Sequence, residues 1–189
     1  MRKVELNEIA SLAQQAKGKI NKIYLHWSAG KYNQTFADYH INVSGAGAIS
    51  VSTDDFAQVL AHTWRRNTGA IGITLCCAYN AEPDSLGLPT GDFPPTKEQI
   101  EVMAKVVAVL AENLDLNISE NVVMTHAEAA LLDGYGVNSR DPETRWDLWK
   151  LEDFDGVVKN GGNVLRGKAI WYQEQAKKSG LKSFFDLFK

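Results

Sequence analysis

The chain has only two cysteines among its 189 residues, and these are neighbours, Cys76 and Cys77. Adjacent cysteines rarely bridge each other, so a disulfide framework is excluded and we expect folding in a reducing compartment. The sequence has no apolar run of the length that spans a bilayer. Its first eight residues carry acidic side chains and lack the apolar segment of a signal peptide, which predicts synthesis in the cytoplasm without an export signal.

The sequence also lacks a strong excess of charge of either sign. Lysine and arginine number 20 against 23 aspartates and glutamates, which gives a net charge of −3. Proteins that bind nucleic acid usually carry a strong basic excess, so we expect no nucleic-acid partner and disfavour a metal nuclease. A hydrophobic content of 44% and a charged content of 23% are ordinary for a globular protein and exclude wholesale disorder.

Apolar periodicity alternates between helix and strand along the chain. The spacing predicts helices over about 6–16 and 97–114, the second opened by a capping box at Thr96 to Gln99, and a short helix over 34–38. Strands are predicted over 22–27, 39–44, 48–52, 70–76 and 121–125. Strands interleaved with helices indicate an α/β fold, a central mixed β-sheet flanked by helices, followed by a C-terminal helical tail.

Two of these strands each deliver a histidine to a turn of small residues. The run Lys22–Trp27 carries His26 just before Ser28-Ala29-Gly30, and Asn121–Thr125 is followed by His126. Two imidazoles and one carboxylate, with room left for water, are typical of catalytic zinc. The residues alone leave the carboxylate open among Glu128, Asp133, Asp141 and Asp147. Metal binding by Cys76 and Cys77 is disfavoured because they lie on a strongly predicted strand.

Five segments in this order resemble the zinc-dependent N-acetylmuramoyl-L-alanine amidase family, which includes phage endolysins, muropeptide amidases and peptidoglycan-recognition proteins. They are His26–Gly30, Tyr39–Ile41, His62–Ile73, Thr125–Glu128 and Arg145–Asp147, within a resemblance that covers roughly residues 20–151. The resemblance implies a zinc ion (Zn2+) in a groove on the sheet. It makes His26, His126 and Asp147 the zinc ligands.

The resemblance also implies roles for residues around the metal. Tyr39 matches a tyrosine that assists catalysis, and Arg145 stands where the family commonly has a lysine and would stabilise an oxyanion. His62 and Asn67 would line the substrate groove. Thr74 occupies the position of a glutamate base in muropeptide amidases, and a threonine cannot act as that base.

The composition changes after about residue 151, and Asn160–Asn163 reads as a hinge. We therefore predict a catalytic domain over residues 1–158 and an amphipathic helical tail over 159–189. Lysines and large apolar residues alternate in the tail, notably over 181–189. Such a segment either docks on its own domain, the more common fate, or contacts membrane or cell-wall polymer through its positive charge.

The resemblance implies hydrolysis of the amide bond between N-acetylmuramic acid and L-alanine in peptidoglycan. With no export signal, a phage or prophage endolysin that reaches the cell wall after release is the favoured biological role. A cytoplasmic muropeptide-recycling amidase and a non-catalytic peptidoglycan-binding module are the alternatives.

Overall fold

The computed structural model describes residues 1–137, 139 and 145–178. Its main elements, in chain order, are β1 (Arg2–Val4), α1 (Leu6–Ala16), β2 (Lys22–Trp27), β3 (Ile41–Val43), β4 (Ile49–Val51), β5 (Ala70–Leu75), α2 (Lys97–Leu114), β8 (Val123–Thr125), α3 (His126–Leu132) and α4 (Gly161–Lys178). Two small hairpins complete it, β6 (Glu82–Pro83) with β7 (Pro89–Thr90) and β9 (Lys150–Glu152) with β10 (Val158–Asn160).

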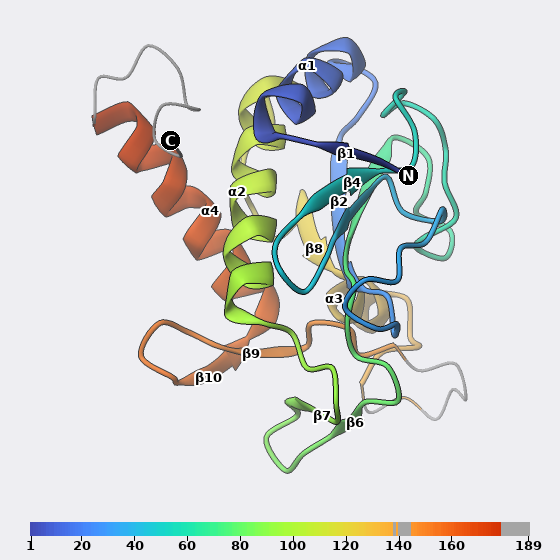
Figure 1. Ribbon diagram of the computed structural model, residues 1–189, viewed down its shortest axis with the longest axis vertical. Coiled ribbons are helices and arrows are strands. Elements are labelled where there is room, and N and C mark those ends of the chain that lie inside the picture. The colour runs from blue at the N-terminus through green and yellow to red at the C-terminus, as the bar shows by residue number, and fades with distance from the viewer. Residues whose placement is uncertain (138, 140–144, 179–189) are drawn as a thin grey trace.

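A six-stranded mixed sheet forms the centre, in the order β1-β4-β3-β5-β2-β8. The strands β3, β5, β2 and β8 run parallel, and β4 and β1 are added antiparallel at one edge. The predicted α/β class with a central mixed sheet and flanking helices is confirmed (Figure 1). Because β2 and β8 are parallel neighbours, residues at their carboxyl ends meet at one edge of the sheet.

Side chains of β2 alternate between the two faces of the sheet. Ile23, Leu25 and Trp27 belong to the main core cluster, whereas Tyr24 joins a smaller cluster on the other face. His26 has the parity of Tyr24, so it points away from the main core. This alternation places an imidazole on the face where loops, rather than long helices, cover the sheet.

Helices α1 and α2 lie side by side on the main-core face (Figure 1). The predicted capping box of α2 is confirmed: Thr96 Oγ1 accepts from Gln99 N at 3.0 Å, and Gln99 Oε1 accepts from Thr96 N at 3.0 Å. Gln99 is fully buried, and its side-chain amide also donates to the Val43 and Cys76 carbonyls. The start of α2 is thereby fixed to the ends of β3 and β5.

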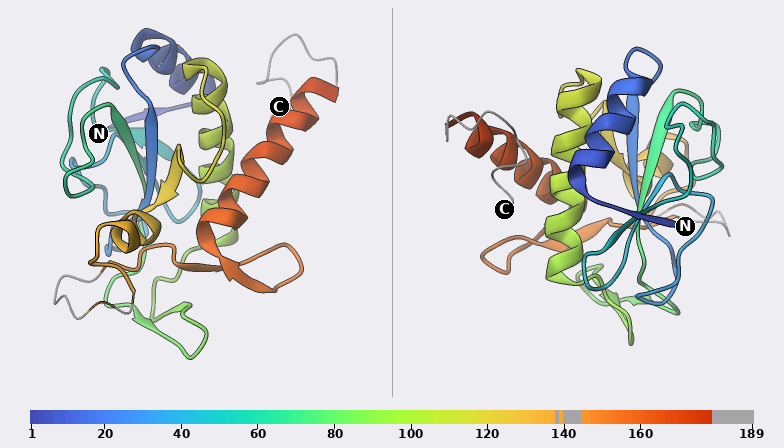
Figure 2. Two further views of the ribbon diagram at one scale, coloured as in Figure 1. Left: turned by 180° about the vertical axis from the view of Figure 1, so that it is seen from behind. Right: turned by 45° about the horizontal axis from the view of Figure 1, so that its top comes forward.

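The connection from β4 to β5, residues 52–69, covers the opposite face (Figure 2). Its Phe56 is buried, and His62 packs directly against Gly72 of β5. A Cβ atom on Gly72 would lie 2.5 Å from His62 Cγ. The glycine is therefore required by the space that the imidazole occupies.

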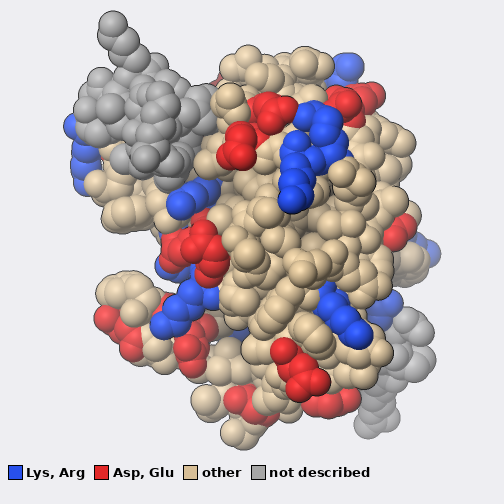
Figure 3. Space-filling model, viewed as in Figure 1, with Lys and Arg blue, Asp and Glu red and all other residues tan. Residues whose placement is uncertain are grey.

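Helix α4 packs along α2 on the side away from the sheet (Figures 1 and 2). Glu101 of α2 pairs with Lys168 and accepts a hydrogen bond from Tyr172 Oη at 2.7 Å. On the face of the molecule viewed in Figure 1, positive and negative side chains are interspersed (Figure 3). Residues 161–178 of the predicted tail thus dock on the rest of the chain, whereas 179–189 lie outside the described residues.

The predicted hinge at Asn160–Asn163 is wrong, because α4 already begins at Gly161. Gly161 lies against the Leu148 carbonyl and Gly162 against the Glu128 carboxylate, closer than a side chain would allow. These glycines serve close packing rather than flexibility. The domain boundary at 158/159 stays a prediction.

The short helix predicted over 34–38 is also wrong. The Asn42 side chain accepts from Phe36 N at 2.9 Å and donates to Phe36 O at 3.1 Å, which holds an irregular backbone there. The sequence pattern predicts none of the short strands β1, β6, β7, β9 and β10. Among the described residues, none of the helices combines the length and apolar character needed to cross a bilayer.

Replacing Gly72 by alanine is expected to lower the free energy of unfolding by about 1–3 kcal/mol, because the new methyl group overpacks His62. Gly167→Ala is the matched control, since Gly167 is helical and a Cβ atom added there would have no neighbour within 4 Å. That change should raise the free energy of unfolding by about 0.5–1 kcal/mol. Urea unfolding curves measure both, and equal effects of the two substitutions would contradict the packing role of Gly72.

Candidate metal centre

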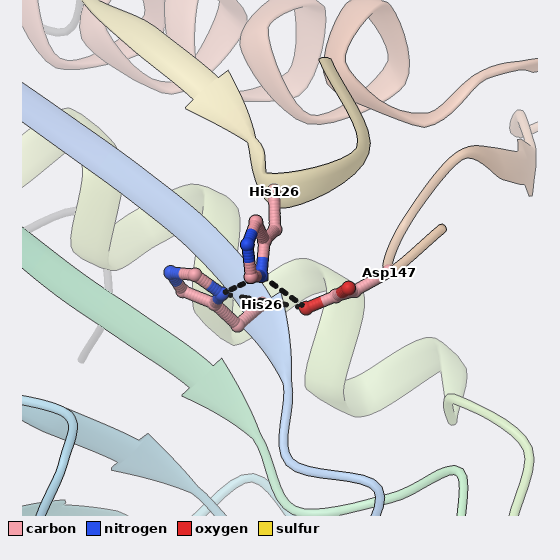
Figure 4. Close-up of side chains that lie close together, drawn as sticks. All are labelled: His26, His126 and Asp147. Atoms are coloured by element: carbon pink, nitrogen blue, oxygen red, sulfur yellow. Dashed lines mark hydrogen bonds and ion pairs between the residues drawn. The ribbon is translucent and has the colours of Figure 1, made fainter. Parts of the chain in front are cut away.

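Three side chains from distant parts of the chain converge at the carboxyl ends of β2 and β8 (Figure 4). His26 Nδ1 lies 3.1 Å from His126 Nδ1, and Asp147 Oδ2 lies 3.3 Å from the first nitrogen and 3.2 Å from the second. All three residues are buried, with Asp147 6% exposed. The donor atoms therefore form a nearly equilateral triangle beneath the surface.

Each donor is held by a different local feature. His26 is the fifth residue of β2, and His126 is the first residue of α3, whose N-cap Thr125 accepts from Glu128 N at 3.2 Å. Asp147 lies in a turn that Leu148 closes with a positive φ of 57° and a fully buried side chain. The Asp147 carbonyl also accepts from Ala127 N at 3.4 Å, so the turn is fastened beside His126.

The geometry fits a single divalent ion. Two ligands bonded to a tetrahedral zinc ion at about 2.0–2.1 Å are roughly 3.3 Å apart, close to the three separations found here. Hydrogen bonds alone do not explain the three short separations. If both Nδ1 atoms carried a proton and donated to Asp147 Oδ2, the two protons would lie unfavourably close together. Two unprotonated Nδ1 atoms and a carboxylate are satisfied together by one cation.

Burial keeps the donors in the form that binds metal. It lowers the pKa of His26 to about 4, so this imidazole is neutral at pH 7. For Asp147, burial opposes ionisation, but the charge of His126 and hydrogen bonds from both imidazoles lower the pKa of the carboxyl overall. The site thus presents a neutral His26 imidazole and an Asp147 carboxylate at neutral pH.

The other candidate ligands have different partners. Glu128 pairs with Arg166 at 2.9 Å, and Asp133 forms a two-pronged ion pair with Arg66 at 2.6 and 2.7 Å. Burial raises the pKa of the Cys76 thiol to about 11 and that of Cys77 as well, so neither is a thiolate at neutral pH. Asp141 lies outside the described residues.

A groove of about 980 Å³ opens over the donor triangle. Tyr39 and Arg145 both line it, as do His62 and Asn67. The Tyr39 ring lies 5.0 Å from the His26 ring, and burial together with the Asp147 charge raises the pKa of its hydroxyl. Aromatic and charged residues form most of the remaining wall, namely Trp27, Trp64, Tyr135, Trp146, Asp38, Arg65 and Asp133.

His62 and Asn67 are engaged mainly with their own loop. Asn67 Oδ1 accepts from the backbone N–H groups of His62 and Thr63 at 3.1 and 2.8 Å. His62 is 6% exposed, and burial lowers its pKa to about 2. Both residues line the groove, and their polar contacts stabilise the loop that forms its wall. Their contact with a substrate stays a prediction.

His40, by contrast, is bonded to backbone through both ring nitrogens. Its Nε2 meets the Gln58 carbonyl at 2.8 Å, and its Nδ1 accepts from Gly72 N at 3.0 Å. Both ring nitrogens are thus used by backbone groups, which gives His40 a structural role.

Comparison with known proteins gives the family. The family model described as N-acetylmuramoyl-L-alanine amidase (Amidase_2) matches residues 14–144, well over half of the chain. The chain belongs to the N-acetylmuramoyl-L-alanine amidase family. The match contains His26 and His126 and ends just before Asp147.

The chain is also similar, at low identity, to a solved structure of peptidoglycan recognition proteins. This is the crystal structure of tracheal cytotoxin bound to the ectodomain complex of the peptidoglycan recognition proteins LCa and LCx. Identity is 18% and the TM-score 0.42, over 68% of this chain and 80% of that one. No curated protein matches the chain.

A helix beyond the family match supports the strand that leads to the donor triangle. Arg166 of α4 is 5% exposed and donates to the Val123 carbonyl at 2.8 Å and to both oxygens of Glu128 at 2.9 Å. Glu128 in turn accepts from Thr125 N at 2.9 Å. Arg166 therefore braces the junction of β8 and α3, which carries His126.

Sequence reasoning missed two hydroxyl groups behind the histidines. Thr63 Oγ1 lies 3.3 Å from His26 Nε2, and Tyr135 Oη lies 3.4 Å from His126 Nε2. Thr63 stands inside a segment that carried the family resemblance, but nothing local marks its hydroxyl. Tyr135 lies in a glycine-flanked loop that reads only as a connection.

The free energy of unfolding of the metal-free protein is expected to fall as the pH drops from 6.5 towards 4. In the unfolded chain His26 and His62 titrate near 6.5, whereas burial lowers both pKa values in the folded protein. The unfolded state therefore binds more protons in this window, and the slope approaches about 1.4 kcal/mol per pH unit for each histidine. Urea titrations with a chelator present, between pH 7.5 and 4.5, measure it.

The matched variant for this measurement is His62→Phe, which keeps an aromatic ring but removes one titrating group. Its stability should depend on pH less steeply than that of the wild type over the same window. Identical slopes, or a wild-type stability that is constant down to pH 4.5, would contradict neutral burial of these imidazoles.

Proposed function

We propose that this protein is a zinc-dependent amidase that hydrolyses the bond between N-acetylmuramic acid and L-alanine in peptidoglycan. One observation carries the proposal: His26, His126 and Asp147 offer three donors 3.1–3.3 Å apart, beneath a groove that His126 and Asp147 line, in a chain of the amidase family. Zinc held there would supply a Lewis acid and a nucleophile at neutral pH. Three protein ligands leave a position for the reacting groups.

The chain's own residues then position and stabilise the reacting amide. Arg145 lines the groove beside the donor triangle, where a fixed guanidinium stabilises negative charge that develops on the carbonyl oxygen. Tyr39 keeps its proton because burial raises its pKa, so it acts as a hydrogen-bond donor rather than a base. These two groups supply the electrostatic part of the mechanism.

Thr74 departs from the glutamate that the family resemblance implies. It pairs with His26 across β5 and β2, is fully buried, and directs its hydroxyl to the Leu75 carbonyl at 3.3 Å. A hydroxyl of this kind takes no proton at neutral pH. Proton transfer in this chain therefore does not use a base at position 74.

The groove wall suits a carbohydrate–peptide polymer. Trp64 is 54% exposed at the groove, and the Arg65 guanidinium lies 4.1 Å from the centre of its ring. A sugar ring packs on such an aromatic face, and a guanidinium pairs with the carboxylates of stem peptides. We extend the proposal to an endolysin, of phage or prophage origin, that acts on the intact cell wall after release from the cytoplasm.

Digestion of intact sacculi, followed by mass spectrometry, tests the function. The zinc-loaded protein should release stem peptides with free L-alanine amino termini and form no new reducing sugar ends. Asp147→Asn should lower the rate by more than the ~100-fold typical of changes outside the ligand set, because it removes a charged ligand. Chelation should abolish the activity, and added zinc should restore it.

Three results would each favour a different function for this protein. New reducing ends would indicate a glycosidase. Binding to sacculi without cleavage, by a folded protein that takes up no zinc, would favour a peptidoglycan-binding module. Cleavage of soluble anhydro-muropeptides but not of sacculi would favour muropeptide recycling over lysis.

Arg145→Met is expected to lower kcat by about 10²–10³, the cost of removing one oxyanion donor. Zinc content should be unchanged, because Arg145 is not a donor to the ion. Arg145→Lys keeps the charge and should retain more activity than the methionine variant. An unchanged kcat in Arg145→Met would remove this residue from the mechanism.

A further inference from the structure

The two histidines of the donor triangle are oriented alike: Nδ1 of each ring faces inward and Nε2 faces outward. Nδ1 of each faces the other donors, and Nε2 of each meets a hydroxyl group: Thr63 Oγ1 for His26, at 3.3 Å, and Tyr135 Oη for His126, at 3.4 Å. The two hydroxyls come from different loops. The arrangement is thus repeated around two independent rings.

We propose that Thr63 and Tyr135 are positioning residues that hold His26 and His126 in the tautomer with Nδ1 free to bind a metal ion. The inference rests on the proposed function for the identity of the ion. Neither residue belongs to the donor set. Each hydroxyl oxygen accepts a hydrogen bond from the Nε2–H group of its histidine and thereby fixes the plane of the ring.

The proton count around Thr63 supports this role. A metal-binding Nδ1 carries no proton, so His26 must carry its proton on Nε2, where Thr63 Oγ1 can accept it. The Thr63 hydroxyl can then donate a hydrogen bond to His62 Nδ1, 2.9 Å away. Donation therefore runs outward from His26 through Thr63 and ends at His62, whose Nε2 atom is buried without a hydrogen-bond partner among the described residues.

The far end of this chain is rigid. His62 packs against Gly72 of β5, and Asn67 Oδ1 holds the backbone N–H groups of both His62 and Thr63. The Thr63 hydroxyl is therefore fixed relative to the sheet that carries His26. A fixed acceptor selects a ring orientation more strongly than a mobile one.

Tyr135 is fixed in the same manner on the other side. Its backbone N–H donates to the Ala130 carbonyl at 3.0 Å, and its own carbonyl accepts from Arg145 N at 3.1 Å. The side chain is 8% exposed, with the Trp64 ring edge-on at 5.6 Å. The segment that bears the oxyanion candidate Arg145 is thus tied to the residue that orients His126.

Without these acceptors the metal-free site has a competing arrangement. His26 is fully buried, so an Nε2–H group with no acceptor destabilises this tautomer. The proton would then move to Nδ1, where Asp147 Oδ2 lies 3.3 Å away and accepts it. That tautomer has no lone pair on Nδ1 for the ion, so metal affinity falls.

The test measures zinc affinity by competition with a chromophoric chelator, in wild type and in Thr63→Val, Thr63→Ser and Tyr135→Phe. The valine variant keeps the shape of the side chain and the serine variant keeps the hydroxyl. Thr63→Val and Tyr135→Phe should each weaken zinc binding by about 10–100-fold, and Thr63→Ser should bind close to wild type. The effects should add in the double variant, since each hydroxyl serves a different ring.

A second readout separates positioning from loss of structure. In the metal-free protein, ¹⁵N NMR of the imidazoles should report protonated Nε2 in wild-type His26 and a shift of the proton towards Nδ1 in Thr63→Val. Zinc affinity and tautomers that match the wild type in all three variants would overturn this inference while leaving the proposed function intact. A wild type that binds no zinc would overturn both.

Discussion

The Asp147 carboxylate is 6% exposed and faces two imidazoles across 3.2–3.3 Å. An ionised carboxylate loses hydration on burial, at a cost of several kcal/mol unless a partner compensates. Here the partners are His126 and a His26 whose own burial favours the neutral form. A cation between the three donors would remove this imbalance, which requires that the donors be held in place.

The fold meets this requirement by placing the donors on fixed supports. Parallel pairing of β2 with β8 brings His26 and His126 together although 100 residues separate them. Thr63 and Tyr135 contact the outer ring nitrogens, and Arg166 of α4 braces the β8–α3 junction. Helix α4 lies beyond the segment that the family model matches.

Local patterns were sufficient for the strands β2, β3, β4, β5 and β8 and for the two histidines, because the apolar run of β2 and the capping residues of α2 act within a few positions. They were insufficient for the third donor: four carboxylates remained open, and only the family resemblance singled out Asp147. Contacts such as Tyr135 with His126 depend on loop conformation, which no local pattern encodes. The glycines at 161 and 162 misled in the same way, since their small size serves packing against distant residues.

Diffraction from zinc-soaked crystals, with anomalous data collected on both sides of the zinc absorption edge, tests the central claim most directly. The account predicts one strong anomalous peak, bonded to Nδ1 of His26, Nδ1 of His126 and a carboxylate oxygen of Asp147. A peak elsewhere, bonding through Nε2 of either histidine, or no peak at saturating zinc would contradict it.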